Sequence, residues 1–573
     1  MPDRFIDVES DRRTFLKRGL LAGGALALPG AGAPTAAQAR RPRRSRVRGA
    51  PGSSRAPNIL VILVDQLRAP AWVPASLALD VLLGNIASLR NESVSFERHY
   101  TASNDCSPSR GALLTGLYSH QTGCMITGRS ELSHGFPTWG TLLRELDYKT
   151  TWWGKWHLNP HANASLEPYG FSGGTYPSPN GSPGQGTEVD PTIVDQFENW
   201  FDLQGGSGPW CTTVSLVNPH DVAWWYRFTS EIQRESEPPA WVSQLPPNFE
   251  TPEQLLTGGK PLLHRSLQET AARSFGVVPF DGPEMVGAWS GLMNTYLLLQ
   301  TYVDRQIGRV LAKLAARPEV SGNTVILFTS DHGEYGGSHG MRGKGASAYE
   351  EAIRVPLYVS DRRGVATAAT GVPRNQLTSS VDIVPLLLSI ATGSNAWRAE
   401  SSLRHLAGRA DLAAICADAQ APGRPWVLHA TDEDVTEFAG EEHDAEAPRH
   451  VVALRTEQGK LGLYSNWGQE SIEAEPTGQE VECYDYSSDV GQAELANVAG
   501  SSALEEQLRA TLEQEAIPNE LHAPLPGYLQ GPVRKGMSDY FDVDAGESEK
   551  AAASHLHVAA PIEPTPDSDR PRT

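Results

Sequence analysis

Four stretches of the chain have the pattern of buried strands that end in polar side chains. Residues 59–64 are six consecutive apolar residues, and Asp65 and Gln66 follow them directly. Three further candidate strands, at 148–153, 212–217 and 324–329, also end in titratable or amide side chains. Such runs are typical of parallel strands that are buried on both faces. Because open α/β sheets bind ligands beyond the carboxyl ends of their strands, we expect a polar site there.

The segments between these strands predict helices and loops. Apolar residues recur every three or four positions from Leu292 to Leu314, which predicts a helix that ends before Pro318. Residues 161–190 are rich in Gly, Pro, Ser and Asn and predict a long surface loop, and residues 228–285 predict loops with short helices. From about residue 425, short alternating runs predict a small antiparallel sheet, which a helix over 504–516 closes.

These patterns predict an α/β fold with a large, mixed, mostly parallel sheet flanked by helices. A smaller C-terminal antiparallel sheet with a helix follows it. We expect a main domain over 56–424, a C-terminal subdomain over 425–516 and an irregular tail over 517–573, where Pro and acidic residues are frequent.

Composition excludes several classes of protein. The 573 residues are 39% hydrophobic, which is close to the globular norm and rules out a wholly disordered chain. Lys+Arg 48 against Asp+Glu 68 gives a net charge of −20, which argues against a nucleic-acid partner. Beyond the N-terminal segment, no uncharged apolar run has the length of a membrane-spanning helix.

The N-terminus has the features of an export signal. Arg12 and Arg13 precede Phe15-Leu16-Lys17, an apolar stretch covers 19–28, and Ala37-Gln38-Ala39 forms a small-x-small cleavage site. The paired arginines favour a signal peptide of the twin-arginine type over 1–39, although a basic helix or a membrane anchor is the alternative. Residues 40–55, with seven arginines and no acidic residue, predict a disordered basic linker. We therefore expect export to the periplasm or beyond by the twin-arginine machinery.

The segment from Cys106 to Gly116, CSPSRGALLTG, is the most informative in the chain. Pro108 suits the first turn of a helix, where no backbone donor is needed. Free amides at such a helix start favour an anion, and Arg110 adds a fixed positive charge for a tetrahedral oxyanion. For Cys-x-Pro alone, a structural cysteine beside a helix is the more ordinary interpretation. The full string resembles the signature of the type I sulfatases, in which Cys-x-Pro-x-Arg marks the cysteine for oxidation to formylglycine.

The resemblance covers roughly residues 56–500. Pro57 to Gln66 is similar to the first strand of that family, whose end binds a divalent metal, and residues 330–334 (SDHGE) are similar to its second metal motif. Further matches are GKWHL at 154–158, NPHD at 218–221, Lys344, and the closing segment 482–497. Many sulfatases have Asp-Asp where this chain has Asp65-Gln66, and Asn often replaces His332. This pairing is closer to that of choline-sulfatase and phosphonate monoester hydrolase relatives.

The resemblance implies an alkaline phosphatase-like fold and a role for each matching residue. Asp65, Gln66, Asp331 and His332, with the modified Cys106, would hold one divalent metal ion, most simply Ca²⁺, with Mg²⁺ or Mn²⁺ as alternatives. The hydrated aldehyde of residue 106 would be the nucleophile that attacks sulfur. Arg110 and Lys155 would hold it, His157 would be the base, and His220 and Lys344 would bind sulfate and protonate the leaving alkoxide. A formylglycine-generating enzyme is then a required partner.

Three functions are compatible with these residues. The leading one is hydrolysis of a sulfate ester on a small molecule or glycan, with release of an alcohol and sulfate. The nearest alternative uses the same site on phosphonate monoesters or phosphodiesters, since sulfate and phosphate monoanions share a shape. A non-catalytic anion- or glycan-binding protein would be expected to have a damaged site, whereas Cys106, Arg110 and both aspartates are intact. The other cysteines, at 124, 211, 416 and 483, have no spacing typical of a disulfide framework, and we expect buried thiols.

Overall fold

The computed structural model describes most of the chain from Ala56 onward. The described residues are 56–70, 74, 77–159, 163–233, 235–364, 367–433, 443–467 and 474–532. The predicted signal peptide (1–39), the predicted linker (40–55) and residues 533–573 of the predicted tail lie outside them.

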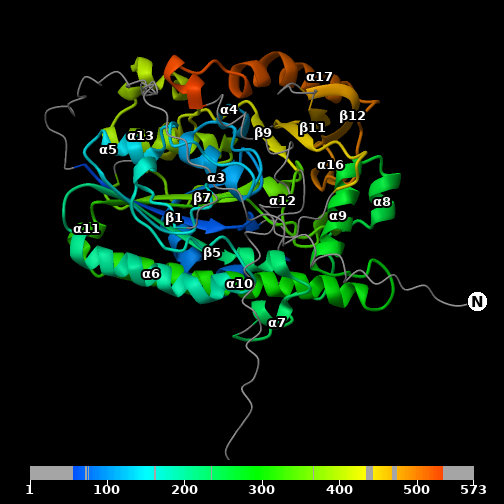
Figure 1. The fold of residues 1–573 in the computed structure, drawn as a ribbon, viewed down its shortest axis with the longest axis horizontal. Helices are drawn as coiled ribbons and strands as arrows, with labels where there is room; N and C mark the ends of the chain where they lie inside the picture. The colour runs from blue at the N-terminus through cyan, green and yellow to red at the C-terminus, as the bar shows by residue number, and fades with distance from the viewer. Residues whose placement is uncertain are drawn as a thin grey trace, which may run out of the picture. The chain divides into compact units, whose positions relative to one another are not determined.

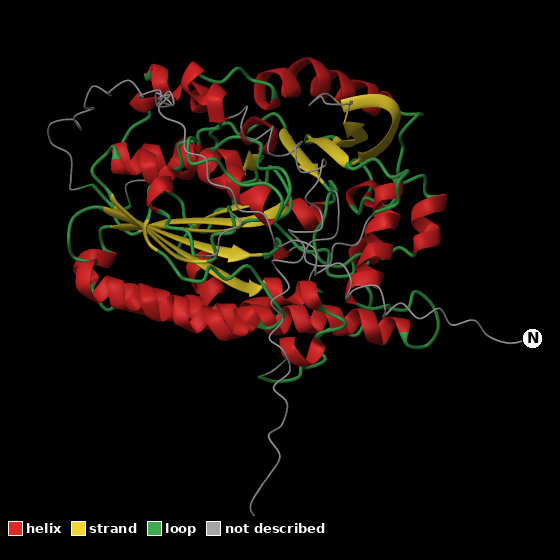
Figure 2. Cartoon of the chain, viewed as in Figure 1, coloured by secondary structure: helices red, strands yellow, loops and turns green. Residues whose placement is uncertain are grey.

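The described strands form two sheets (Figure 2). The larger sheet has eight strands in the order β4-β3-β5-β1-β6-β7-β2-β8. Its strands are β1 (Asn58–Asp65), β2 (Val94–Tyr100), β3 (Lys149–Gly154), β4 (Ser172–Gly173), β5 (Trp210–Pro219), β6 (Thr324–Ser330), β7 (Arg354–Asp361) and β8 (Thr378–Ser379). The smaller sheet is antiparallel, with β9 (Val427–Asp432), β10 (His450–Arg455), β11 (Gly459–Trp467) and β12 (Ala474–Asp485).

The four predicted strands are β1, β3, β5 and β6, and they are neighbours in the centre of the large sheet. β3 pairs with β5, β5 with β1 and β1 with β6, and every one of these pairings is parallel. Only β7 runs antiparallel to its neighbours β6 and β2. The expected mixed, mostly parallel sheet with a second antiparallel sheet is therefore confirmed. The carboxyl ends of the four central strands meet at one edge.

Helices cover both faces of the large sheet (Figure 1). The α-helices of the described residues are α1 (Leu79–Leu82), α2 (Gly84–Asn91), α3 (Cys106–Thr115), α4 (Ser119–Thr122), α5 (Trp139–Arg144), α6 (Gln185–Gln204), α7 (Thr229–Ile232), α8 (Pro252–Thr257), α9 (Leu262–Phe275), α10 (Met285–Ala315), α11 (Pro318–Ser321), α12 (Glu350–Ile353), α13 (Ile383–Thr392), α14 (Arg404–Ala407), α15 (Leu412–Ala417), α16 (Asp489–Gln492) and α17 (Ala503–Thr511). The long helices α6 and α10 lie on one face, and α3, α5 and α13 lie on the other.

The alternation of side chains along β1 explains this three-layer arrangement. Ile59, Val61 and Leu63 pack with α3, α5 and α13, whereas Leu60, Ile62 and Val64 pack with α6 and α10. All six side chains are fully buried. An unbroken apolar run is what a strand needs when successive side chains enter opposite cores.

The small sheet packs against the helix that begins at Cys106. Leu428 of β9 and Leu461 of β11 share a buried cluster with Ala112 of α3 and Leu508 of α17. The backbone amide of Ala430 also donates to the carbonyl of Ala102, at 3.0 Å. The C-terminal sheet therefore supports the segment that leads into Cys106.

Two predicted loop or tail regions contain more helix than expected. Within 161–190, α6 begins at Gln185, because its apolar residues Ile193, Val194 and Phe197 need the face of the sheet. After α17, a π-helical segment, η9 (Leu512–Leu521), continues beyond Ala516.

All five cysteines of the chain are buried and unbridged, as expected from their spacing.

Candidate active site

Cys106 is the first residue of α3 and is fully buried at the edge where the central strands end. Pro108 lies in the first turn of the helix, as the sequence predicts. The next residue, Ser107, fixes this helix start, because its amide donates to Thr127 Oγ1 at 3.0 Å and its hydroxyl donates to the carbonyl of His157 at 2.6 Å. These two hydrogen bonds fix the backbone of the helix start from which the Cys106 side chain projects.

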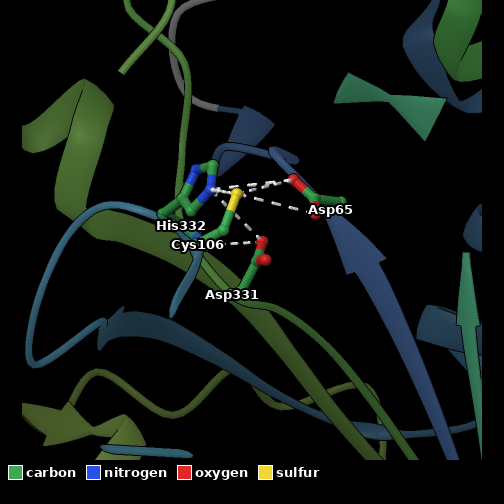
Figure 3. A group of neighbouring side chains, drawn as sticks. All are labelled: Asp65, Cys106, Asp331 and His332. Carbon is green, nitrogen blue, oxygen red and sulfur yellow. Dashed lines mark hydrogen bonds and ion pairs between the residues drawn. The ribbon is translucent and has the colours of Figure 1, made fainter. Parts of the chain in front are cut away.

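Side chains from the ends of β1 and β6 surround the Cys106 thiol (Figure 3). Asp65, Cys106, Asp331 and His332 each offer a ligand atom, and these four atoms lie within 4.8 Å of one another. Sγ of Cys106 lies 3.3 Å from His332 Nε2 and 3.8 Å from Asp65 Oδ1. Two carboxylates and an imidazole, all buried, form a donor set that fits a divalent cation.

Gln66 belongs to the same group, and its orientation is held on several sides. Its side-chain amide nitrogen donates to Glu334, and its Oε1 accepts from Lys344 Nζ at 3.2 Å. Its backbone has φ +64°, in the left-handed region that is uncommon for residues other than glycine. Tyr296 of α10 holds this turn by donating to the carbonyl of Gln66 at 2.7 Å. Lys344 Nζ, which Gln66 Oε1 accepts from, therefore links Gln66 to the Cys106 thiol.

Arg110, one helical turn after Cys106, joins the two strand ends. Its Nη2 lies 2.9 Å from Asp65 Oδ2, and its Nε lies 2.8 Å from Asp331 Oδ2. A third donor, Nη1, reaches the carbonyl of Lys155 at 2.8 Å and Ser215 Oγ at 3.1 Å. Each aspartate therefore keeps its Oδ1 on the side of His332. Nε2 of His332 lies 3.6 Å from Asp65 Oδ1 and 3.8 Å from Asp331 Oδ1.

Two lysines bring positive charge to the thiol. Lys155, directly after β3, lies 2.7 Å from Asp65 Oδ2 and 3.5 Å from Cys106 Sγ. Lys344 comes from the loop after β6 and lies 3.1 Å from the same Sγ. Two ammonium groups that converge on one buried atom suit an anionic substrate or an anionic form of that atom.

The two predicted histidines, His157 and His220, are buried close to this group. Burial, reinforced by Lys155, holds the pKa of both imidazoles well below the usual value. His157 has φ +57°, and its Nδ1 has no hydrogen-bond partner among the described residues. A neutral imidazole with a free nitrogen can accept a proton.

The carboxylate of Asp65 stays charged in this site despite its burial. Burial alone would raise its pKa, but the cations Lys155 and Arg110 hold that pKa well below the usual range. Burial lowers the pKa of His332 to about 4, so its imidazole is uncharged near neutral pH. Its Nδ1 donates to the carbonyl of Gly333 at 3.0 Å, which leaves the lone pair on Nε2. The charge states therefore match those of a metal site.

The structure thus gathers the strand-end and helix-start residues that the sequence singles out. It also adds three residues that the sequence analysis does not name as functional: Ser215 and Tyr296, described above, and Ser109, which donates to the carbonyl of Asp331. Ser215 lies in the middle of β5, inside an apolar strand pattern, and no local signal in the sequence indicates its contact with Arg110.

Comparison with known proteins agrees with this geometry. The family model named Sulfatase matches residues 57–394. The chain therefore belongs to the sulfatase family and is a sulfuric ester hydrolase by that membership.

Two curated relatives illustrate the similarity. An uncharacterised sulfatase of Escherichia coli K12, YidJ, is 27% identical over 370 residues, which cover 58% of this chain and 68% of the relative. The choline-sulfatase of Rhizobium meliloti is 26% identical over 371 residues, which cover 58% of this chain and 67% of the relative. The chain thus spans about two thirds of the length of these relatives.

A solved structure shows the same fold. The phosphonate monoester hydrolase from Silicibacter pomeroyi superimposes with a TM-score of 0.57 at 22% identity, over 80% of this chain and 94% of that one.

Proposed function

We propose that the protein hydrolyses sulfate esters with a formylglycine made from Cys106 and one divalent metal ion. The observation that supports this most is the position of the Cys106 thiol. It lies at a helix start, between the Asp65–Asp331–His332 group and the ammonium groups of Lys155 and Lys344. A purely structural cysteine has no need of two cations and three ligands.

Asp65, Gln66, Asp331 and His332 would hold the metal together with residue 106. Three of these four offer oxygen atoms, which favours a hard cation and makes Ca²⁺ the first expectation, ahead of Mg²⁺ or Mn²⁺. When bound, the ion would supply positive charge that stabilises an oxygen anion on residue 106 at neutral pH.

The surrounding residues bind the sulfate group, orient the aspartates and transfer protons. Lys344 and His220 bind the sulfate oxygens, and Lys344 donates a proton from Nζ to the alcohol oxygen as its bond to sulfur breaks. Arg110 and Lys155 hold the two aspartates in place. His157 accepts the proton that residue 106 must lose when the aldehyde is restored and sulfate leaves. No water molecule has to attack sulfur.

The substrate would be a sulfated small molecule or glycan, as the family and the choline-sulfatase relative suggest. Hydrolysis of phosphonate monoesters or phosphodiesters is the second candidate, favoured by the fold shared with a phosphonate monoester hydrolase. Parallel rates on p-nitrophenyl sulfate and a phenyl phosphonate separate the two. A higher kcat/KM on the phosphonate would overturn the preference for sulfate.

The first prediction tests the nucleophile. Trypsin should release residues 99–110 with Cys106 and residues 111–129 with Cys124. After coexpression with a formylglycine-generating enzyme, the first peptide should lose about 18 Da, because CH₂SH becomes CHO. The second peptide is the internal control and should keep the thiol mass.

Cys106→Ala should abolish turnover and leave thermal unfolding nearly unchanged, because the helix start is held by the backbone and hydroxyl of Ser107. An active enzyme whose first peptide contains only unmodified cysteine would exclude formylglycine as the nucleophile.

The second prediction tests the metal. Asp331→Asn removes one anionic ligand and the ion pair with Arg110 at 2.8 Å. We expect bound Ca²⁺, measured by mass spectrometry of the dialysed protein, to fall below stoichiometry, and kcat/KM to fall by about 100-fold or more. Asp195→Asn, at an exposed position of α6, is the control and should change neither quantity. Full activity in verified metal-free protein would contradict the metal requirement.

A further inference from the structure

A second group of potential metal ligands lies outside the site described above. It consists of His120 on α4, Asp432 at the end of β9 and His450 at the start of β10. The three side chains are buried, with exposed fractions of 6%, 6% and 4%. His120 is more than 300 residues from the two strand residues in the sequence, and the three ligand atoms converge to within 4.8 Å of one another.

The spacing of these atoms fits a small coordination sphere. His120 Nε2 lies 3.3 Å from Asp432 Oδ2, and His450 Nδ1 lies 3.0 Å from Asp432 Oδ1. Ligands about 2.0–2.1 Å from a tetrahedral zinc ion are separated from one another by about 3.3 Å. Each imidazole nitrogen therefore lies about one such edge length from one of the two carboxylate oxygens.

The charge balance also points to a cation. Asp432 is buried, and in the described part of the chain its ion pairs are with the two imidazoles and with no lysine or arginine. Because a buried carboxylate requires a compensating positive charge, a cation bound by the three side chains would supply it.

A comparable group elsewhere shows the contrast. His339, Glu351 and Glu494 also converge, but lysine and arginine side chains already neutralise them. Lys460 lies 2.5 Å from Glu494, and Arg68 lies 3.6 Å from Glu351. That group needs no ion.

We propose that His120, Asp432 and His450 bind a divalent transition-metal ion, with Zn²⁺ as the best match, at a structural site separate from the active site. Two imidazoles and one carboxylate suit Zn²⁺, whereas the oxygen-rich set around Cys106 suits a hard cation. Trp467 holds the carboxylate, because its Nε1 donates to Asp432 Oδ1 at 2.7 Å and its ring lies 3.9 Å from that of His450. Such a contact orients a metal ligand.

The position of this zinc site gives it a structural role. The site joins the helix pair α3–α4 to the small sheet. Thr431, the neighbour of Asp432, accepts a hydrogen bond from the amide of Asn104 at 3.2 Å, two residues before Cys106. An ion here would therefore fix the small sheet against the segment that presents the nucleophile. The inference does not depend on the proposed chemistry at Cys106.

Metal analysis of the full-length protein tests the zinc site. The protein is first dialysed against metal-free buffer, and one equivalent of ZnCl₂ is then added. We expect about one tightly bound Zn²⁺ per chain and a rise in the unfolding temperature. We also expect the visible absorption spectrum of the Co²⁺-substituted protein to be that of a cobalt ion with imidazole ligands and a low coordination number. A protein that takes up no Zn²⁺ and unfolds at the same temperature with and without it would overturn the proposal.

Variants assign the bound zinc to these residues. His120→Gln and His450→Gln should each lose the bound Zn²⁺ and its effect on unfolding, while His134→Gln, at an exposed position, should keep both. Asp331→Asn should also keep the Zn²⁺, since it alters the active site alone. Zinc uptake that is lost in Asp331→Asn and kept in His120→Gln would place the ion at the active site and overturn the proposal.

A milder variant covers the case in which the histidine variants do not fold. Trp467→Phe keeps all three ligands and removes only the indole N–H that orients Asp432. We expect it to weaken Zn²⁺ binding by about 10- to 100-fold. Unchanged affinity would contradict the proposed geometry.

Discussion

Arg110 shows how a single side chain organises the candidate active site. It lies 2.8–2.9 Å from both metal-site aspartates and reaches a carbonyl of the segment after β3 with a third nitrogen. Each partner is held by a different nitrogen of the planar guanidinium, whereas lysine has all its donors on one nitrogen, so lysine is no substitute. Because the pairs are fully buried, they cost desolvation, and their main effect is to fix the orientation of the carboxylates.

His220 depends on a glycine for its place in the site. Gly181, in the loop before α6, has φ +103°, and a Cβ there would lie 2.4 Å from Cε1 of the His220 ring. The start of α6, directly after this loop, is held by Asp221, whose Oδ1 accepts from the amide of Gly186 at 3.0 Å. The loop therefore packs directly on the imidazole.

The third prediction is that Gly181→Ala displaces His220. We expect kcat/KM for a sulfate ester to fall by about 10- to 100-fold, with metal content unchanged, because the imidazole loses its position and the metal ligands do not. Gly208→Ala is the matched control, since Gly208 also has positive φ (+85°) but nothing lies within 4 Å of its added Cβ. Equal losses in both variants would show that backbone strain, and not His220, is responsible.

Much of the site could be predicted from single residues, because strand ends and a helix start are visible in the sequence. Asp65, Asp331 and His332 follow apolar runs, and the Cys106 motif identifies its own helix. Ser215 and Tyr296 could not be predicted. Each contacts the site from an element whose packing depends on tertiary structure, and neither has a distinctive local pattern.

At the scale of elements, periodicity predicted the strands better than the ends of helices. All four predicted central strands exist within one or two residues of their expected bounds. The stretch before Gln185 is mostly loop, but it also contains the two-residue strand β4, and the helix that follows Gly184 was hidden by its polar start. Composition marks a loop well, but it does not locate where packing against a sheet begins.

The segment after Ala516 is tied to the fold by Glu520. Its carboxylate lies 2.8 Å from Arg424 and 3.0 Å from Arg409, and it accepts a hydrogen bond from Tyr118 at 2.7 Å. Burial would raise its pKa, but Arg424 and Arg409 outweigh burial and lower the pKa to about 2. The sequence shows only an acidic, Pro-containing tail here and does not indicate this anchor.

The fourth prediction concerns Glu520→Gln. A carboxylate with a lowered folded-state pKa contributes stability above its unfolded pKa and loses that contribution as pH falls through about 4.5 toward 2. We expect the variant to be less stable by on the order of 3 kcal/mol near pH 7 and the difference to shrink by about pH 3. Urea unfolding at both pH values measures it. Glu515→Gln, at an exposed position of the same helical segment, is the control, and a difference that does not change with pH would contradict the role of the charge.

At the scale of the whole molecule, no helix in the described part of the chain is long and apolar enough to cross a membrane.

The burial of the active site constrains the order of modification, folding and export. Cys106, Arg110 and Lys155 are fully buried in the folded protein. If Cys106 is converted to formylglycine, as we propose, the modifying enzyme must reach it before the site closes and therefore before folding ends.

The fifth prediction follows from that order and from the predicted signal. We propose that the twin-arginine machinery exports the protein after modification, metal loading and folding in the cytoplasm. Replacing Arg12 and Arg13 with lysine keeps the charge but removes the guanidinium groups that the receptor would recognise. The variant should accumulate in the cytoplasm as active enzyme with an intact leader and a formylglycine at position 106. Fractionation, intact mass and sulfatase activity measure this, with the wild-type protein as the exported control. If the lysine variant is exported and cleaved near Ala39, the leader belongs to the general secretory type, and modification must then occur on a chain that has not yet folded.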